Sequence, residues 1–166
     1  VGDNELFPID DFRKALKVVL RRDGEKALGY GDPAGYLPLR TTIARIVSVQ
    51  GIPTRPEEVL ITSGSQQAIA LVAGLLLRPG DVVLVESPTY RGAIDLFRSQ
   101  DIRLVGMPTD ENGMVVEKIE EAIKGAQPKL IYTIPTFHNP TGVSLSGIRR
   151  RQLIDIARRH NVPILE

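Results

Sequence analysis

Three polar segments of this sequence have residue types that can hold a planar, phosphorylated molecule. The first is a Ser-Gly-Ser-Gln-Gln-Ala run at 63–68, which opens a helix predicted over 66–77. The first N–H groups of a helix have no partner within it and lie at the positive end of its dipole, so this run is placed to bind a phosphate. An ordinary helix cap made by Ser63 or Ser65 is the alternative interpretation.

A tyrosine and an asparagine follow two other apolar runs. Tyr90 ends a Ser-Pro-Thr-Tyr segment after the run at 82–86, where its ring can stack on a planar ligand or pack on the domain surface. Asn139 follows the run at 130–134 in a loop stiffened by two prolines and a glycine. Its amide can bind a ring oxygen or bond its own backbone. His138 is interpreted as a polar loop residue rather than a catalytic base.

The elements that must position these segments alternate between strands and helices. Apolar, β-branched runs predict strands at 59–62, 82–86, 102–107, 130–134 and 162–165. Helical periodicity is found at 8–22, 38–50, 66–77, 90–100, 116–124 and 146–160. This alternation predicts an α/β fold with a mostly parallel sheet and flanking helices. Ligands bind at the carboxyl ends of such strands, so we expect the loops at 63–67, 89–90 and Asn139 to converge at one sheet edge.

The amino-acid composition excludes several classes of protein and several kinds of functional site. The 166 residues are 42% hydrophobic and 25% charged, which is enough for about one packed core and excludes global disorder. The formal net charge of +1 carries no signature of nucleic-acid binding, and the absence of cysteine excludes thiolate chemistry. Two histidines leave little for a metal site, and none is predicted. No apolar run reaches the ~18–20 residues that span a bilayer. Both ends read like the interior of a longer chain.

Four motifs together resemble the fold-type I pyridoxal-phosphate enzymes of aminotransferase class I/II. They are the Asn-Pro-Thr-Gly motif from Asn139, the segment at 63–68, the Ser-Pro-Thr-Tyr segment ending at Tyr90, and a Tyr-Gly-Asp-Pro-Ala-Gly-Tyr-Leu-Pro-Leu-Arg block from Tyr30. Their order and spacing match across nearly the whole chain. The resemblance implies pyridoxal 5'-phosphate as cofactor, an amino acid and a 2-oxo acid as substrates, no membrane, and a cytoplasmic homodimer.

The resemblance also implies a role for each motif residue. Ser65 and Gln66 would hold the cofactor phosphate, largely through backbone N–H groups, and Tyr90 would stack on the pyridine ring. Asn139 would hydrogen-bond the phenolic oxygen of that ring. Tyr30 would reach the phosphate of the neighbouring subunit. The aspartate, lysine and arginine that complete the family's active site are expected beyond Glu166, so no catalytic residue is assigned and the segment alone is expected to be inactive.

The resemblance predicts a truncated large domain. Residues 1–50 would be N-terminal helices and an interdomain or dimer segment, and 51–166 the first part of the cofactor-binding domain. The family's seven strands run in the spatial order 3-2-4-5-6-7-1, and the five predicted here would be numbers one to five. The strand at 59–62 would therefore lack both neighbours. In the helix at 38–50 we expect Leu39, Ile43, Ile46 and Val47 to face inward.

Two functions follow from the resemblance. One is amino-group transfer in a full-length aminotransferase. The other is an effector-binding domain of a MocR-type regulator of the GntR family, which the segments at 7–13 and 28–33 favour. Nucleic acid would then be bound only by a separate winged-helix domain preceding Val1. An α/β domain without a cofactor is the remaining alternative.

Overall fold

The computed structural model describes residues 4–166, which form two compact units. Unit 1 is Val1–Thr62 and unit 2 is Ser63–Glu166. The predicted division of roles at residue 50 stays a prediction. Within residues 4–166, every helix is too short or too polar to cross a membrane.

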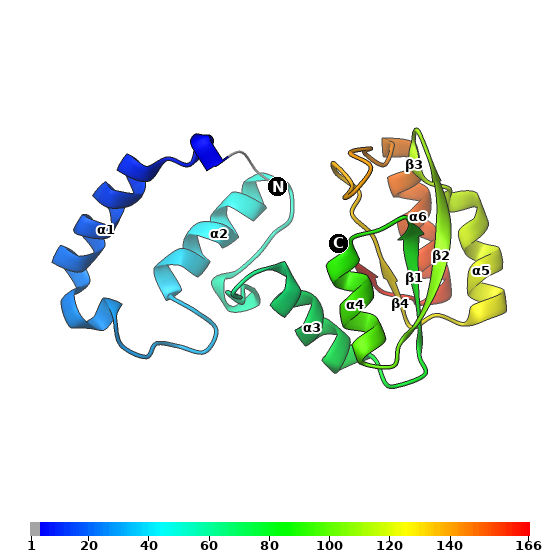
Figure 1. The fold of residues 1–166 in the computed structure, drawn as a ribbon, viewed down its shortest axis with the longest axis horizontal. Coiled ribbons are helices and arrows are strands. Elements are labelled where there is room, and N and C mark those ends of the chain that lie inside the picture. The colour runs from blue at the N-terminus through cyan, green and yellow to red at the C-terminus, as the bar shows by residue number, and fades with distance from the viewer. Residues whose placement is uncertain (1–3) are drawn as a thin grey trace. The chain divides into compact units, whose positions relative to one another are not determined.

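Unit 2 is built on a five-stranded sheet with the order β3-β2-β1-β4-β5 (Figure 1). Its parallel strands are β1 (Val82–Ser87), β2 (Arg103–Asp110), β4 (Leu130–Tyr132) and β5 (Ile164–Leu165). A short strand, β3 (Gly113–Met114), runs antiparallel to β2. The α/β class and the expected order of the four parallel strands are confirmed.

Helices cover both faces of this sheet. They are α3 (Ser65–Leu76), α4 (Arg91–Ser99), α5 (Ile119–Ala126, after a 3₁₀ turn at Val116–Lys118) and α6 (Gly147–His160). Alternate residues of a strand point to opposite faces. In β1, Val83 and Val85 join a buried cluster with α3 and α4, whereas Leu84 joins a second cluster with α5 and α6. The sheet is therefore packed on both sides.

Unit 1 is helical and has little interior. Its elements are a 3₁₀ turn at Asn4–Leu6, α1 (Ile9–Asp23), a 3₁₀ turn at Gly24–Ala27, α2 (Leu37–Val49) and a 3₁₀ turn at Pro56–Glu58. Among its described residues only Arg40 and Ala44 are buried. The prediction that Leu39 and Ile46 face inward is wrong, because both are exposed and no other element of unit 1 covers them.

The strand predicted at 59–62 is absent from the structure. This segment is irregular, and the Ile61 N–H donates to the Ala34 carbonyl at 3.0 Å. The Ile61 side chain occupies the space that a Cβ on Gly35 would need, and Gly35 has a φ of +100°. An extended segment becomes a strand only where a neighbouring strand satisfies its backbone groups. Here the segment bonds to the loop at 34–35 instead.

Candidate functional site

Two parallel neighbours bring their carboxyl ends to the same edge of the sheet. β1 and β4 pair in register, with Val85 opposite Tyr132, and each ends within two residues of that pair. The segment leading to Tyr90 follows β1, and the loop that carries Asn139 follows β4. The local sequence thus determines which residues each loop carries, and the register of β1 and β4 determines where the two loops meet.

The N-terminus of α3 leaves backbone N–H groups available for an anion. Gly64 is the N-cap, with a φ of 137° that favours glycine, and no side chain caps the helix. Ser63 does not cap it either, since its own N–H donates to Gln67 Oε1 at 2.6 Å. The cap interpretation of Ser63 or Ser65 is therefore wrong. Ser65 and Gln66 lie exposed in the first turn, where N–H groups have no acceptor within the helix.

Gln66 and Tyr90 lie together. Gln66 Nε2 is 3.5 Å from the Tyr90 hydroxyl oxygen, and Tyr90 is the half-buried residue that caps α4. Gly92, in the first turn of α4, leaves room for both. A Cβ at Gly92 would sit 2.6 Å from the Tyr90 hydroxyl oxygen and would overlap Gln66 Nε2. The structure thus brings two of the predicted site residues into contact around a glycine.

Asn139 lies exposed in a loop that is fixed at both ends. The His138 N–H donates to the Val143 carbonyl at 2.8 Å, which closes the turn around Asn139. Arg150, from α6, donates to the Pro135 carbonyl at 2.6 Å where the loop leaves the sheet. The loop's backbone is therefore held while its amide side chain stays accessible.

A buried carboxylate and a buried imidazole lie beneath this loop. Glu86, at 3% exposure, accepts hydrogen bonds from the Thr133 hydroxyl at 2.8 Å and the Ile134 N–H at 3.0 Å. His138, at 4% exposure, places Nε2 3.1 Å from Glu86 Oε2, outside aligned hydrogen-bond geometry. Its Nδ1 lies 2.9 Å from Thr141 Oγ1. His138 lies in the loop after β4, and its ring is buried there.

Sequence analysis did not single out Glu86. The signal was present, since a lone carboxylate ends an otherwise apolar strand, Val-Val-Leu-Val-Glu. Charged side chains are almost never fully buried unless they are paired, so such a residue predicts a partner without naming it. The partners come from the loop after β4, which is 47 and 48 residues further along the chain.

The phenol of Tyr132 completes the polar surroundings of the site. Burial, helped by the nearby Glu86 and Tyr90, raises the pKa of Tyr132 to about 12. Its ring packs edge-on against Phe97 with the ring centroids 5.9 Å apart. The phenol therefore stays neutral at physiological pH. The nearby Glu86 carboxylate takes its hydrogen bonds from Thr133 and Ile134.

The geometry fits a phosphorylated aromatic ring. Thr89, next to Tyr90, has a buried Oγ1 atom without a hydrogen-bond partner. It adds an unused donor and acceptor to the helix N–H groups and the ring of Tyr90. The remaining predicted residue, Tyr30, belongs to unit 1, where its side chain is fully exposed.

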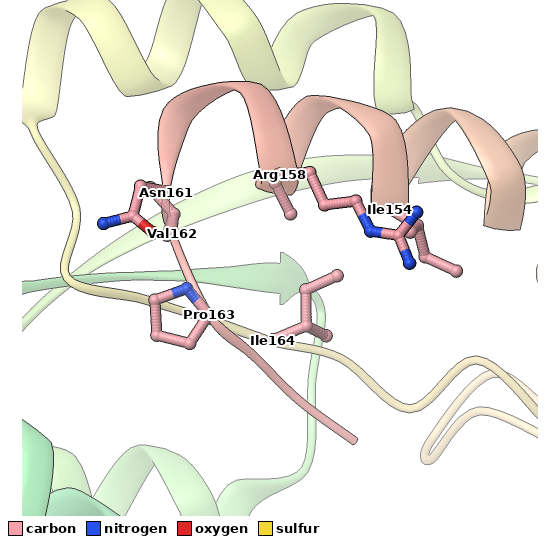
Figure 2. A pocket seen from close by; sticks show the side chains of 7 residues that line it. Ile154, Arg158, Asn161, Val162, Pro163 and Ile164 are labelled. Carbon is pink, nitrogen blue, oxygen red and sulfur yellow. The ribbon is translucent and has the colours of Figure 1, made fainter. Parts of the chain in front are cut away.

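A hollow of about 480 Å³ lies elsewhere in unit 2 (Figure 2). It is formed by the C-terminal half of α6 and by Asn161–Ile164, which lead into β5. Ile154 and Arg158 project over it from the helix (Figure 2). Because it includes the amino end of β5, it is separate from the loops at the carboxyl ends of β1 and β4.

Comparison with known proteins links the chain to one family. The family model described as "Aminotransferase class I and II" matches residues 1–165. A 2-aminoadipate transaminase of Thermus thermophilus is 41% identical, covering 98% of this chain and 40% of the relative. An uncharacterized HTH-type transcriptional regulator of Bacillus subtilis is 32% identical, covering 98% of this chain and 33% of the relative.

Solved structures agree with the sequence relatives. The structure of α-aminoadipate aminotransferase from Thermus thermophilus, complexed with N-(5'-phosphopyridoxyl)-L-leucine, matches with a TM-score of 0.91 and 39% identity. The match covers 99% of this chain and 41% of that one. The chain thus spans about 40% of the length of the aminotransferases that it matches.

Proposed function

Because the chain belongs to the aminotransferase class I and II family, we propose that it forms the cofactor-binding part of a pyridoxal-phosphate-dependent aminotransferase. Such a protein moves an amino group between an amino acid and a 2-oxo acid. The observation that carries the proposal is the contact of Gln66 with Tyr90 beside the N-terminus of α3, which no side chain caps, with the Asn139 loop following the neighbouring strand.

The phosphate is assigned to the first turn of α3. The N–H groups of Ser65 and Gln66 donate to its oxygens, and the helix dipole favours its negative charge. Gly64 at a φ of 137° lets the backbone approach closely without a Cβ in the way. Tyr30 from the partner of a homodimer is assigned to the same phosphate.

The ring is assigned to Tyr90 and Asn139. Tyr90 packs its aromatic face on the pyridine ring, and Gly92 keeps space for that orientation. The Asn139 amide N–H donates to the phenolic oxygen, and Thr89 Oγ1 gains the partner that it lacks. When bound, pyridoxal phosphate supplies the electron sink for breaking a bond at the substrate's α-carbon.

The transfer itself is proposed for the full-length protein. The lysine, the aspartate and the carboxylate-binding arginine are expected beyond Glu166, so these 166 residues supply cofactor contacts rather than the reacting groups. A cytoplasmic homodimer is part of the same proposal. Amino-group transfer is supported by relatives that are named as transaminases and aminotransferases.

A regulator is the second candidate function. The observation that favours it is the group of HTH-type regulators that match 92–98% of this chain at 31–34% identity. In that case the same site binds pyridoxal phosphate as part of an effector-sensing domain, and a separate winged helix binds DNA. A DNA-binding domain ahead of Val1 in the full-length sequence decides for the regulator.

A pair of glycine variants tests the site. Gly92→Ala places a methyl group against Gln66 and Tyr90, whereas a Cβ at Gly125 in α5 meets nothing within 4 Å. In the full-length protein, we expect Gly92→Ala to weaken pyridoxal-phosphate binding by about tenfold, equivalent to about 1.4 kcal/mol. Gly125→Ala should leave the affinity unchanged.

The readouts are the dissociation constant by fluorescence titration and amino-group transfer with a panel of amino acids and 2-oxo acids. Binding with transfer supports the enzyme, and binding without transfer in a DNA-binding protein supports the regulator. A full-length protein that does not bind the cofactor at micromolar concentration contradicts both. Equal affinities for wild type and Gly92→Ala contradict the placement of the site.

A further inference from the structure

The two residues that bracket Asn139 and Pro140 are joined by a polar chain that starts inside the sheet. Glu86 of β1 contacts His138, and His138 contacts Thr141, with heavy-atom distances of 3.1 and 2.9 Å. We propose that Glu86 and His138 are positioning residues, which fix the Asn139 amide for the ring of the cofactor. The inference rests on the proposed function and adds to it residues that touch no ligand.

Glu86 is costly to bury and has no role in apolar packing. A carboxylate taken out of water destabilises the fold unless donors satisfy it, and an apolar side chain of similar size often serves stability as well or better. Two of its donors, the Thr133 hydroxyl and the Ile134 N–H, lie at the start of the loop after β4. The carboxylate thus fastens the Asn139 loop to the end of β1.

The imidazole of His138 transmits this attachment to the far side of the turn. Nε2 faces Glu86 and Nδ1 faces the Thr141 hydroxyl, so a ring proton on Nε2 leaves Nδ1 to accept from that hydroxyl. The backbone repeats the connection, because the Gly142 N–H donates to the His138 carbonyl at 2.5 Å. Asn139 and Pro140 are held between these anchors.

Holding the backbone matters because the Asn139 side chain is exposed. A free amide samples several orientations, and binding has to select one of them. A turn fixed in advance lowers the entropy lost on binding, which is how preorganised sites gain affinity.

The chain carries its own matched control. Its other histidine, His160, places Nε2 3.2 Å from Glu120, in a pair between α6 and α5. The side chains of this pair are 25% and 38% exposed, against 4% and 3% for His138 and Glu86. Both pairs bring an imidazole to a glutamate, Glu120 also binds Arg159, and only the pair of His138 and Glu86 adjoins the Asn139 loop.

The experiment compares Glu86→Gln with Glu120→Gln in the full-length protein. Loss of one charged hydrogen-bonding partner near the site should weaken pyridoxal-phosphate affinity by about tenfold in Glu86→Gln. Glu120→Gln should bind as wild type does. In the cofactor-free protein, nitrogen chemical shifts should report a changed tautomer balance for His138 in the first variant and for His160 in the second.

Thr141 supplies a pair of variants on an exposed position, where folding is not at risk. Thr141→Val removes the hydroxyl that faces Nδ1 and should weaken cofactor affinity about fivefold. Thr141→Ser keeps the hydroxyl and should restore it. If these residues had a purely structural role, Thr141→Val and Glu86→Gln would both lower thermal stability. Thr141→Ser would then not restore the cofactor affinity.

The outcomes separate the two proposals. A wild-type protein that does not bind pyridoxal phosphate overturns the proposed function and the inference with it. A wild type that binds, with Glu86→Gln and Thr141→Val binding equally well, overturns the positioning role alone. Unchanged His138 shifts in Glu86→Gln overturn the polar chain itself.

Discussion

Units 1 and 2 have equally clear helical patterns and very different interiors. In unit 2, a sheet accepts the apolar faces of four helices, and residues such as Phe97 and Leu84 are fully buried. In unit 1, α1 leaves Phe12 and Leu16 more than half exposed. An amphipathic pattern predicts that a helix forms and which face is apolar, but it does not supply the surface that covers this face.

The largest expected effect comes from truncating one phenylalanine in each unit. Phe97→Ala empties a fully buried site against Tyr132 and should lower the free energy of unfolding by about 3–5 kcal/mol. Phe12→Ala, at a residue 66% exposed, should change it by no more than about 0.5 kcal/mol. Denaturant unfolding of the 166-residue chain measures both. A large loss from Phe12→Ala would show that α1 is covered in solution.

A smaller effect is expected at high pH, and only through unit 2. Burial raises the pKa of Tyr132 to about 12, so the native state favours the neutral phenol. Its contribution to stability is complete below pH ~10 and is lost as pH rises from about 10 to 12, at about 1.4 kcal/mol per pH unit at most.

Tyrosinate absorbance should show one late titration, and Tyr132→Phe should remove it together with that part of the alkaline stability loss. The spectrum of Tyr132→Phe, subtracted from that of the wild type, isolates this titration. A Tyr132 that ionises with the ordinary value of about 10 would show that the carboxyl end of β4 is open to water.

The smallest effect concerns ion pairs near the surface. Hydrogen bonds from the Arg149 guanidinium and, to a lesser extent, from the Asn112 N–H hold the pKa of Asp110 below its usual range. Asp110 therefore stabilises unit 2 above the ordinary carboxyl pKa of about 4, and this stability is lost as pH falls through the lower native pKa.

Asp110→Asn should slightly lower stability at neutral pH and flatten its fall in acid. The comparison in unit 1 is Glu58, whose pKa is lowered by the N–H and the side chain of Arg55 three residues earlier. Glu58→Gln should have a weaker effect, since a local exposed pair contributes little and salt screens it. Acid titrations at low and high salt distinguish the two. Equal losses would mean that the Asp110 pair contributes no more than a local one.

Sequence alone located the helices well because their periodicity is local. It placed the four parallel strands, yet it also predicted a strand at 59–62 that the structure lacks. Strand formation depends on partners that are distant in sequence, and the Ile61 N–H bonds to Ala34 instead. The same reason explains the site. Gln66, Tyr90 and Asn139 were identified from motifs, but the burial of Glu86 and His138 arises only when β1 and β4 align.

The outer side of β5 has a consequence for handling the chain in solution. This strand ends the sheet order, and among residues 4–166 no strand pairs with its outer side. Unpaired backbone groups at a sheet edge form a template onto which another chain can add. The template here is short, because β5 has two residues and follows Pro163, which has no N–H to donate. We therefore expect any self-association through this edge to be weak and to rise with protein concentration.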